Sequence, residues 1–270
     1  MAFTHNKGVR IHWQERGTGT PLLLVMGHLF SSVLWYPLLD ALAARHRVIW
    51  FDNRGTGETD TVKGFAVSDM TDDALAVMDA AGVDRAHVFG VSMGGVIVLD
   101  MAVRAPERVI SLTVGASGIM SAEKPRMPKI LLALYYLPPW LLKRLTPSKG
   151  GDQGYGAAAT ADQIAADLAV LKTDKFTVRG VVAQAVAVAN HIQTTQAVAG
   201  VTLPSLVLHG GDDSLVPIKW AEDLAATLPN STFVRLEGAG HNFMVAARET
   251  TLEALRAFLD RVDRSGVSGF

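Results

Sequence analysis

The chain has 270 residues, of which 49% are hydrophobic and 19% are charged, so it can bury a large core and extensive disorder is excluded. Its formal net charge of −1 gives no sign of a nucleic acid or an acidic membrane as a partner. The lack of cysteine excludes disulfides, thiolate metal sites and a cysteine nucleophile.

No targeting or membrane-spanning segment is evident in the sequence. The opening stretch MAFTHNKGVRIHW has no apolar core of signal-peptide length. No charge-free apolar run reaches the roughly 18 residues that a membrane span needs. We therefore expect a cytoplasmic protein without a membrane span, a monomer or homodimer, whose partner is a small molecule.

Short apolar runs alternate with amphipathic helical patterns along the chain. The apolar runs are continuous, as in strands that are buried on both faces. They span residues 21–27, 47–52, 86–92, 109–117, 203–210 and 231–238. The main helical patterns span residues 68–82, 93–109, 217–230 and 249–262. This alternation predicts an α/β fold with a mostly parallel central sheet flanked by helices.

One long segment without a strand pattern interrupts the alternation. It runs over residues 118–200 and includes the apolar stretch KILLALYYLPPWLLKRL. Because it is too apolar to be an exposed linker, we expect an inserted helical cap. The core would then consist of residues 1–117 and 201–270. An insertion at the carboxyl edge of a parallel sheet covers the place where ligands bind.

The junction between an expected strand and an expected helix carries a candidate nucleophile. Gly90-Val91-Ser92-Met93-Gly94 matches the pattern Gly-x-Ser-x-Gly, in which a tight turn strains the backbone of the serine. The flanking positions approach other backbone closely and therefore need glycine. The serine oxygen then projects at a helix start, where free N–H groups favour a developing anion. The alternative is a serine that only caps the helix.

A serine hydroxyl needs a base within hydrogen-bond reach, and the chain offers eight histidines. His241 is the candidate, because the loop EGAGHNF follows a strand and can carry an imidazole to the edge where Ser92 lies. The other seven are expected at the surface or on an edge strand (His5, His12, His46), at strand ends (His87, His209), at a helix end in the insert (His191) and near the sheet edge (His28).

The stretch HGGDDSLVP offers two carboxylates to orient that base. We favour Asp213, because Val216-Pro217 then begins the next helix. Asp212 is the alternative acid. If Asp212 is not the acid, we expect it to be a turn residue that caps this loop. About one helix and one strand separate Asp213 from His241, so both side chains would emerge at the same end of adjacent strands. The expected catalytic triad is therefore Ser92, Asp213 and His241.

The oxyanion of an acyl-transfer reaction needs two hydrogen-bond donors. One expected donor is the backbone N–H of Met93, directly after the serine. The other should come from the loop after LLLVMG. The backbone N–H of His28 is the first choice, and that of Leu29 is the alternative.

With the triad in the order Ser92, Asp213, His241, the chain resembles the α/β-hydrolase superfamily over nearly its whole length. The stretch FDNRGTGETD looks like the superfamily's Asp-x-x-Gly-x-Gly-x-Ser loop, with Thr59 in place of the serine, and there Asp52 has a structural role. GVSMGG and LVLHGGDDSLVP also match common forms. The nearest group contains serine esterases, lactonases and cofactor-free haloperoxidases, including polyketide methylesterases.

The chain departs from this group at one point. Many relatives have His-Gly before the oxyanion residue, whereas this sequence has Met26-Gly27 followed by His28. The resemblance implies an α/β-hydrolase fold that works with neither a metal nor an organic cofactor. The departure concerns the oxyanion donor and leaves the expected mechanism unchanged.

These residues and the resemblance together predict a serine hydrolase that cleaves carboxylic esters through an acyl-enzyme. The apolar insert indicates a small to medium apolar substrate. We expect Leu29, Tyr135, Trp140 and Val216 to wall the substrate pocket. A lactonase or a C–C bond hydrolase would use the same triad, and a hydrolase-fold receptor would bind a ligand without turning it over.

Overall fold

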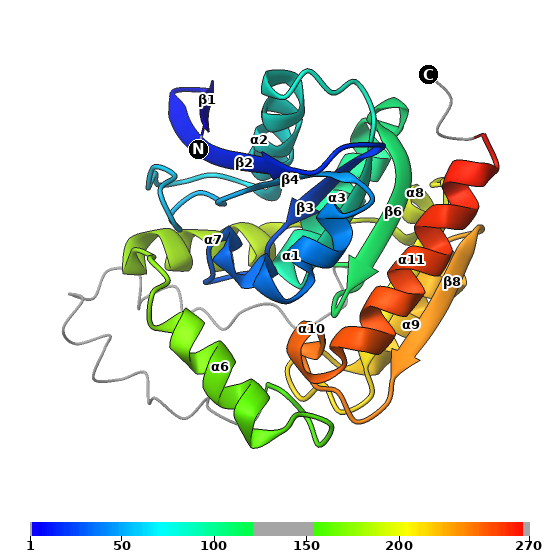
Figure 1. Cartoon of the computed structure of the whole chain (residues 1–270). Helices are drawn as coiled ribbons and strands as arrows, with labels where there is room; N and C mark the ends of the chain where they lie inside the picture. The colour runs from blue at the N-terminus through cyan, green and yellow to red at the C-terminus, as the bar shows by residue number, and fades with distance from the viewer. Residues whose placement is uncertain (1, 121–153, 267–270) are drawn as a thin grey trace.

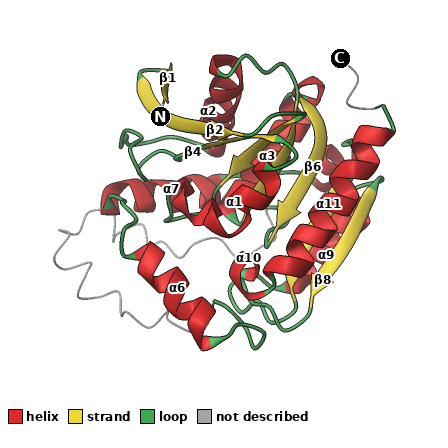
Figure 2. Ribbon diagram, viewed as in Figure 1, coloured by secondary structure: helices red, strands yellow, loops and turns green. Residues whose placement is uncertain are grey.

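The computed structural model describes residues 2–120 and 154–266. They form an eight-stranded sheet with helices around it (Figures 1 and 2). The strand order across the sheet is β1-β2-β4-β3-β5-β6-β7-β8. The strands are β1 (Ala2–Asn6), β2 (Val9–Arg16), β3 (Pro21–Val25), β4 (Arg47–Phe51), β5 (Ala86–Val91), β6 (Val109–Gly115), β7 (Ser205–Gly210) and β8 (Ser231–Leu236).

The six strands from β4 to β8 in this order are mutually parallel, and only β2 pairs in the antiparallel sense, with β1 and with β4. The prediction of a mostly parallel sheet is thus confirmed. Strand β1 was not expected, because it is short, lies at the sheet edge and alternates half-buried with exposed residues. It therefore lacks the continuous apolar run that marks the central strands.

Helices cover both faces of the sheet, as Figure 2 shows. They are η1 (Ser32–Trp35), α1 (Tyr36–Ala43), α2 (Val67–Ala80), α3 (Met93–Arg104), η2 (Pro106–Arg108), α6 (Ala161–Leu171), α7 (Val178–Asn190), α8 (Thr195–Ala199), α9 (Ile218–Thr227), α10 (Phe243–Ala246) and α11 (Arg248–Arg264). Along β3, Leu23 and Val25 belong to the apolar core under α2, α3 and α9, and Leu22 and Leu24 to the core under α1 and α11. Burial on both faces explains why β3 is apolar at every position.

Helices α6, α7 and α8 lie in the insert between β6 and β7. Helix α6 contacts α10, and Figure 1 shows it beyond the end of the sheet. Its first turn is fixed by Thr160, whose side chain accepts from the N–H of Gln163 while the Gln163 side chain accepts from the N–H of Thr160. Tyr135 and Trp140 lie outside the described residues, and the cap boundaries at 118 and 200 stay a prediction.

Two histidines expected at the surface or an edge are buried. His12 is 4% exposed, because its ring turns inward from β2 and its Nδ1 lies 2.8 Å from Oδ2 of Asp52. His46 is 3% exposed and packs edge-on against the ring of His87. Both expectations were wrong, since the sequence neighbours of a histidine do not reveal what its ring packs against in the folded chain.

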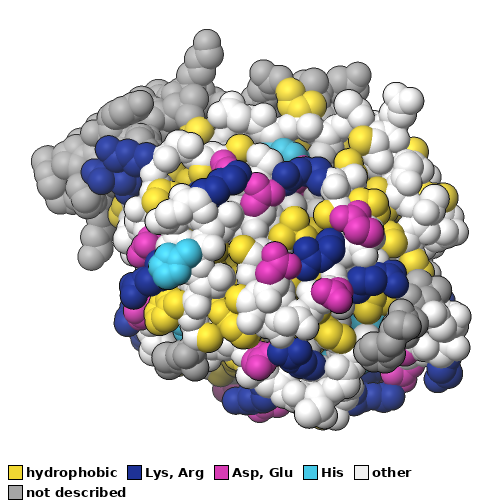
Figure 3. Space-filling view, turned by 90° about the horizontal axis from the view of Figure 1, so that it is seen from above, with side chains coloured by type: hydrophobic (Ala, Val, Ile, Leu, Met, Phe, Trp, Pro, Cys, Tyr) yellow, Lys and Arg dark blue, Asp and Glu magenta, His cyan; other side chains and the backbone are white. Residues whose placement is uncertain are grey.

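The described surface is mixed in charge. On the face in Figure 3, acidic and basic side chains are interspersed with apolar ones, in keeping with the net charge of −1. Among the described helices, none is both long enough and apolar enough to span a membrane.

Candidate active site

Ser92 lies at the tight turn between β5 and α3. Its backbone has φ 56° and ψ −118°, a conformation that costs a non-glycine residue on the order of 1–3 kcal/mol. Its N–H donates to the carbonyl of Gly115 at 2.8 Å, which ties the turn to the neighbouring strand. A strained serine that is held at the start of a helix is the geometry that the Gly-x-Ser-x-Gly pattern predicts.

The two glycines of this turn are required by close backbone approach. A Cβ atom on Gly90 would lie 2.1 Å from the carbonyl oxygen of Gly94. One on Gly94 would lie 2.0 Å from the carbonyl oxygen of Val25. Any side chain at either position would therefore push α3 away from the sheet and move Ser92.

Asp213 and His241 form a hydrogen-bonded pair on the loops after β7 and β8. Nδ1 of His241 lies 2.8 Å from Oδ2 of Asp213. Oδ1 of Asp213 accepts the N–H groups of Leu215 and Val216 at 2.8 and 2.9 Å. The Asp213 side chain is fully buried and the imidazole is 19% exposed. The carboxylate is thus held at both oxygens, and the imidazole is fixed at Nδ1 and partly exposed.

The environment of Asp213 keeps its carboxylate ionised. Burial raises its pKa, but the hydrogen bond and charge of His241 and the two backbone N–H groups together outweigh burial and leave the pKa below its ordinary value. His209 adds a second imidazole, with Nε2 3.4 Å from Oδ2 of Asp213 and 3.0 Å from the carbonyl of Val216. Burial lowers the pKa of His209, which favours its neutral form there.

Asp212, the alternative acid, contacts the insert, whereas the imidazole binds Asp213. It is exposed, and its Oδ2 lies 3.5 Å from the N–H of Ala157 in the insert. Asp213 rather than Asp212 is therefore placed to orient His241.

Ser92 and His241 open onto one cavity of about 240 Å³. None of the described residues that line it is Asp, Glu, Lys or Arg. Its described lining comprises Met26, Gly27, His28, Phe30, Leu34, Val91, Ser92, Gly154, Tyr155, Leu171, Leu215, His241, Asn242 and Met244. The cavity suits a small, uncharged and largely apolar group.

Leu29 and Val216, expected in the pocket, are not part of this lining, whereas their neighbours Phe30 and Leu215 are. Leu29 has φ 82°, a conformation that redirects the loop at this residue. Val216 turns its N–H toward Asp213 and its carbonyl toward His209. The correct loops were assigned to the cavity from the sequence. Which residue of each loop lines the cavity depends on the backbone conformation of that loop.

Of the two expected oxyanion donors, His28 lines the cavity and Met93 directly follows Ser92. Met93 is the first residue of α3, so its N–H has no carbonyl of a preceding helical turn to bind. The N–H of Leu29 donates to Oε1 of Gln184 at 3.1 Å, which leaves His28 as the candidate second donor. The His28 ring is tied to α7, with Nε2 2.8 Å from the carbonyl of Val181, and burial lowers its pKa.

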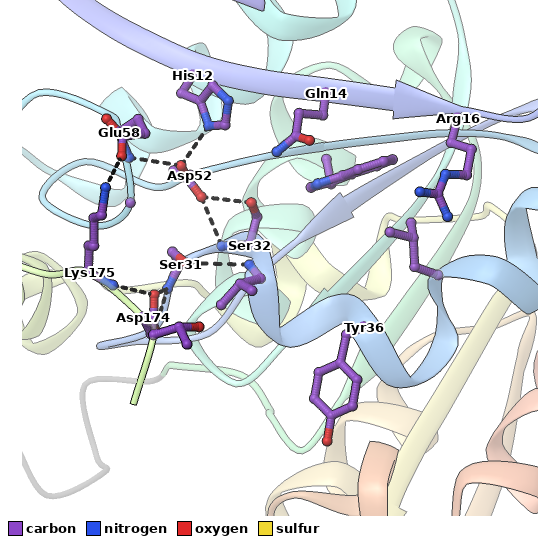
Figure 4. Close-up of a pocket in the computed structure, with 15 residues that line it drawn as sticks. His12, Gln14, Arg16, Ser31, Ser32, Tyr36, Asp52, Glu58, Asp174 and Lys175 are labelled. Carbon is purple, nitrogen blue, oxygen red and sulfur yellow. Dashed lines mark hydrogen bonds and ion pairs between the residues drawn. The ribbon is translucent and has the colours of Figure 1, made fainter. Parts of the chain in front are cut away.

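A second cavity, of about 360 Å³, holds another serine, aspartate and histidine (Figure 4). Here the carboxylate of Asp52 stands in the middle: it accepts from Oγ of Ser32 at 2.7 Å and pairs with Nδ1 of His12 at 2.8 Å. Asp52 also accepts the N–H groups of Ser32 and Glu58. Because the hydroxyl donates to the carboxylate and not to the imidazole, this arrangement braces the loop after β4 instead of activating the serine.

One group among the described residues could hold a metal ion. The ligand atoms of His46, His87 and Asp263 lie within 4.8 Å of one another. His87 sits near the amino end of β5, opposite the end that carries Ser92. Nε2 of His87 lies 3.1 Å from Oδ1 of Asp263, and its Nδ1 lies 2.7 Å from Oγ of Ser111. These contacts tie α11 to the sheet and have no part in the cavity beside Ser92.

Sequence reasoning missed several residues around the site. Tyr155, Leu171 and Asn242 line the cavity, and Asp167 binds two of them. Asn242 directly follows His241, which was a usable signal. The other three lie in the insert, where the pattern of the sequence indicates helices but not which side chains turn toward the core.

Comparisons with known proteins identify the family of the fold. A family model described as alpha/beta hydrolase fold matches residues 20–246. The chain is 30% identical over 281 residues to a RutD protein of Azorhizobium caulinodans, named as a carbamate hydrolase, with 98% of this chain and 100% of that one covered.

Solved structures show the same fold. A thermophilic esterase from Thermogutta terrifontis superposes with a TM-score of 0.79 at 24% identity, covering 96% of this chain and 97% of that one. An enol-lactonase from Burkholderia xenovorans LB400 superposes with a TM-score of 0.80 at 21% identity, covering 96% and 100%. The chain therefore belongs to the α/β-hydrolase family.

Proposed function

We propose that the protein is a serine hydrolase that cleaves carboxylic esters of a small to medium apolar substrate. One observation carries the proposal: the strained Ser92 opens onto the same cavity as His241, and the imidazole of His241 is paired with the buried carboxylate of Asp213. A candidate nucleophile, a candidate base and a residue that can orient the base thus come from one edge of the sheet, which supports the proposal.

In this proposal, Oγ of Ser92 attacks the ester carbonyl carbon while Nε2 of His241 takes the hydroxyl proton. Asp213 holds the imidazole in the tautomer that carries its proton on Nδ1 and stabilises the imidazolium. The N–H groups of Met93 and His28 bind the oxyanion of the tetrahedral intermediate. His241 then gives its proton to the leaving alcohol, and a water molecule repeats the steps on the acyl-enzyme to release the acid.

The cavity favours short, uncharged acyl or alcohol groups. Its 240 Å³ is below the roughly 300–1,000 Å³ that is usual for drug-sized ligands. Apolar side chains such as Phe30, Leu34 and Met244 form much of its wall. A charged substrate group would lose its hydration in this cavity without gaining an ionic partner among the described lining residues.

Other substrates fit the same machinery. A lactone is a cyclic ester, and the enol-lactonase of B. xenovorans has the same fold. The RutD relative is named for carbamates, whose carbonyl the same serine could attack. A C–C bond hydrolase would need a cation for the substrate carboxylate, and the arginine of the described part of the insert, Arg179 on α7, does not line the cavity. A receptor without turnover would leave the strained serine and its base unused.

A panel of neutral p-nitrophenyl esters, a lactone, a carbamate and a carboxylate-bearing ester tests the proposal with the wild type and Ser92→Ala. We expect the short neutral esters to be cleaved fastest and Ser92→Ala to lose at least about 10³-fold in kcat. Ser231→Ala, whose hydroxyl binds the carbonyl of Ala225 at a distance from the cavity lining, is the matched control. Wild-type turnover by Ser92→Ala would overturn the mechanism, and a preference for the charged ester would overturn the substrate class.

A further inference from the structure

The loop that carries His241 is held by the insert on both sides of the imidazole. The N–H of Gly240 donates to the carbonyl of Tyr155 at 2.7 Å, and the N–H of Asn242 donates to the carbonyl of Gly154 at 2.6 Å. These two bonds flank His241 in the sequence. The backbone position of the candidate base is therefore set by a segment outside the sheet.

A buried carboxylate reinforces this clamp. Asp167 on α6 is 1% exposed. Oδ2 of Asp167 accepts from the hydroxyl of Tyr155 at 2.6 Å and from Nδ2 of Asn242 at 2.9 Å. Oδ1 accepts from the hydroxyl of Tyr36, at the start of α1, at 2.8 Å. One carboxylate thus joins the insert, the core and the residue that follows His241.

The donors to Asp167 are hydroxyls and an amide, and these are neutral groups. Burial raises the pKa of both Tyr36 and Tyr155, and the hydrogen bond and charge of Asp167 raise it further. Both hydroxyls therefore stay protonated and continue to donate. A buried carboxylate that binds neutral donors must be fully hydrogen-bonded to be tolerated. The three donors are consequently held in fixed places around it.

We propose that Asp167 is a positioning residue for the base of the active site, acting through Asn242 and Tyr155. This inference rests on the proposed function, because it concerns how His241 reaches Ser92. When α6 is packed against the core, Asp167 fixes the side chains of Asn242 and Tyr155. The loop between β8 and α10 then holds the imidazole of His241 at the cavity. When Asp167 is lost, the loop keeps its backbone bonds but gains side-chain freedom, and the imidazole is misplaced.

The expected effect falls on the chemical step. A displacement of about 1 Å of a catalytic group can cost about 10²-fold in rate. We expect Asp167→Ala to lower kcat for a p-nitrophenyl ester by about 10- to 100-fold with KM changed by less than about three-fold. Asp167→Asn, which preserves the volume and one acceptor oxygen, should fall between Asp167→Ala and the wild type.

Thr160→Ala is the matched control. Thr160 caps the same helix through the N–H of Gln163 at 3.2 Å and binds neither Asn242 nor Tyr155. It should destabilise α6 and lower Tm while kcat stays within about two-fold of the wild type. If Thr160→Ala lowers kcat as much as Asp167→Ala does, the effect belongs to helix stability and the inference is overturned.

A double substitution separates positioning from general stability. If Asp167 acts through Asn242, Asp167→Ala combined with Asn242→Ala should be no slower than the slower single variant. Losses in kcat that multiply would show that the two residues act independently, and would overturn the inference. Unchanged kcat in Asp167→Ala and in Asp167→Asn would overturn it as well.

The failure of this inference can be told apart from a failure of the proposed function. All variants are compared by their rate of covalent labelling at Ser92 with a neutral fluorophosphonate. If the wild type neither labels nor hydrolyses esters, the proposed function fails. If the wild type labels at Ser92 and Asp167→Ala labels at the same rate, only the positioning role of Asp167 fails.

Discussion

Nδ1 of His241 lies 2.8 Å from Oδ2 of Asp213, and the other oxygen of that carboxylate accepts two backbone N–H groups. The acid cannot rotate without breaking these bonds. Because the imidazole donates its Nδ1 proton to this fixed oxygen, its Nε2 carries the lone pair that can accept a proton. The pair is therefore preorganised by hydrogen bonds within the protein.

Asp213→Asn should abolish this preorganisation. The amide that replaces the carboxylate can present its NH2 group to Nδ1 of His241, which stabilises the wrong tautomer, and we expect kcat to fall by about 10³- to 10⁴-fold. Steady-state kinetics with a p-nitrophenyl ester measures the loss. Asp212→Asn, at the exposed neighbour, should remain within about two-fold of the wild type. Equal losses in the two variants would reassign the acid.

Gln184 should be needed to shape the oxyanion loop. Its side chain is buried, with Oε1 accepting from the N–H of Leu29 at 3.1 Å and Nε2 donating to the carbonyl of Arg54 at 2.9 Å. Gln184→Ala frees the loop that carries His28, and we expect kcat to fall by about 10-fold or more, since one lost oxyanion donor costs about 10²- to 10³-fold. Gln193→Ala is the control, because the buried side-chain amide of Gln193 has no hydrogen-bond partner among the described residues. An unchanged kcat in Gln184→Ala would contradict this role.

Gly94→Ala should destabilise the fold and not only the site. Its Cβ would overlap the backbone of Val25, so we expect the free energy of unfolding to fall by about 3 kcal/mol. Urea denaturation measures this change. Gly200→Ala places its Cβ 3.3 Å from the nearest carbonyl oxygen at φ −76°, and should alter stability by less than about 1 kcal/mol. A mild effect of Gly94→Ala would show that α3 can move away from β3.

Stability should fall as the pH decreases from about 6.5 to 5. Burial lowers the pKa of five histidines below the ordinary value near 6.5, namely His28, His46, His87, His191 and His209. Below that pH the unfolded chain binds protons that the folded chain does not, so each such histidine destabilises the fold by at most about 1.4 kcal/mol per pH unit. Urea midpoints at several pH values test this, and His46→Gln should flatten the slope. A midpoint that stays constant or rises toward pH 5 would contradict it.

The sheet and its helices could be predicted because their signals are local. A parallel strand covered on both faces is mostly apolar along its length, so β3, β5 and β7 are evident from short windows of sequence. Strand β1 alternates between half-buried and exposed residues and lies at the edge of the sheet, so its sequence is less distinctive than that of the central strands. The burial of His12 depends on its bond to Asp52, which lies 40 residues away, and no local pattern contains that information.

The residues of the candidate site also divide into those with a local signal in the sequence and those without one. Gly90, Ser92 and Gly94 could be predicted because the turn that requires them spans only five residues of the sequence. The pairing of Asp213 with His241 follows from the ends of adjacent parallel strands. The contacts of Asp167 and Tyr155 with the histidine loop depend on how the insert folds back over the core, which no spacing in the sequence reveals.

Covalent labelling tests the central claim most directly. The wild type, Ser92→Ala and His241→Ala are treated with a neutral fluorophosphonate, and the adduct is located by peptide mass spectrometry. The account predicts one adduct per chain, on Ser92, none in Ser92→Ala, and labelling slowed by at least about 10²-fold in His241→Ala because the base is gone. An adduct on another residue, or labelling of His241→Ala at the wild-type rate, would contradict it.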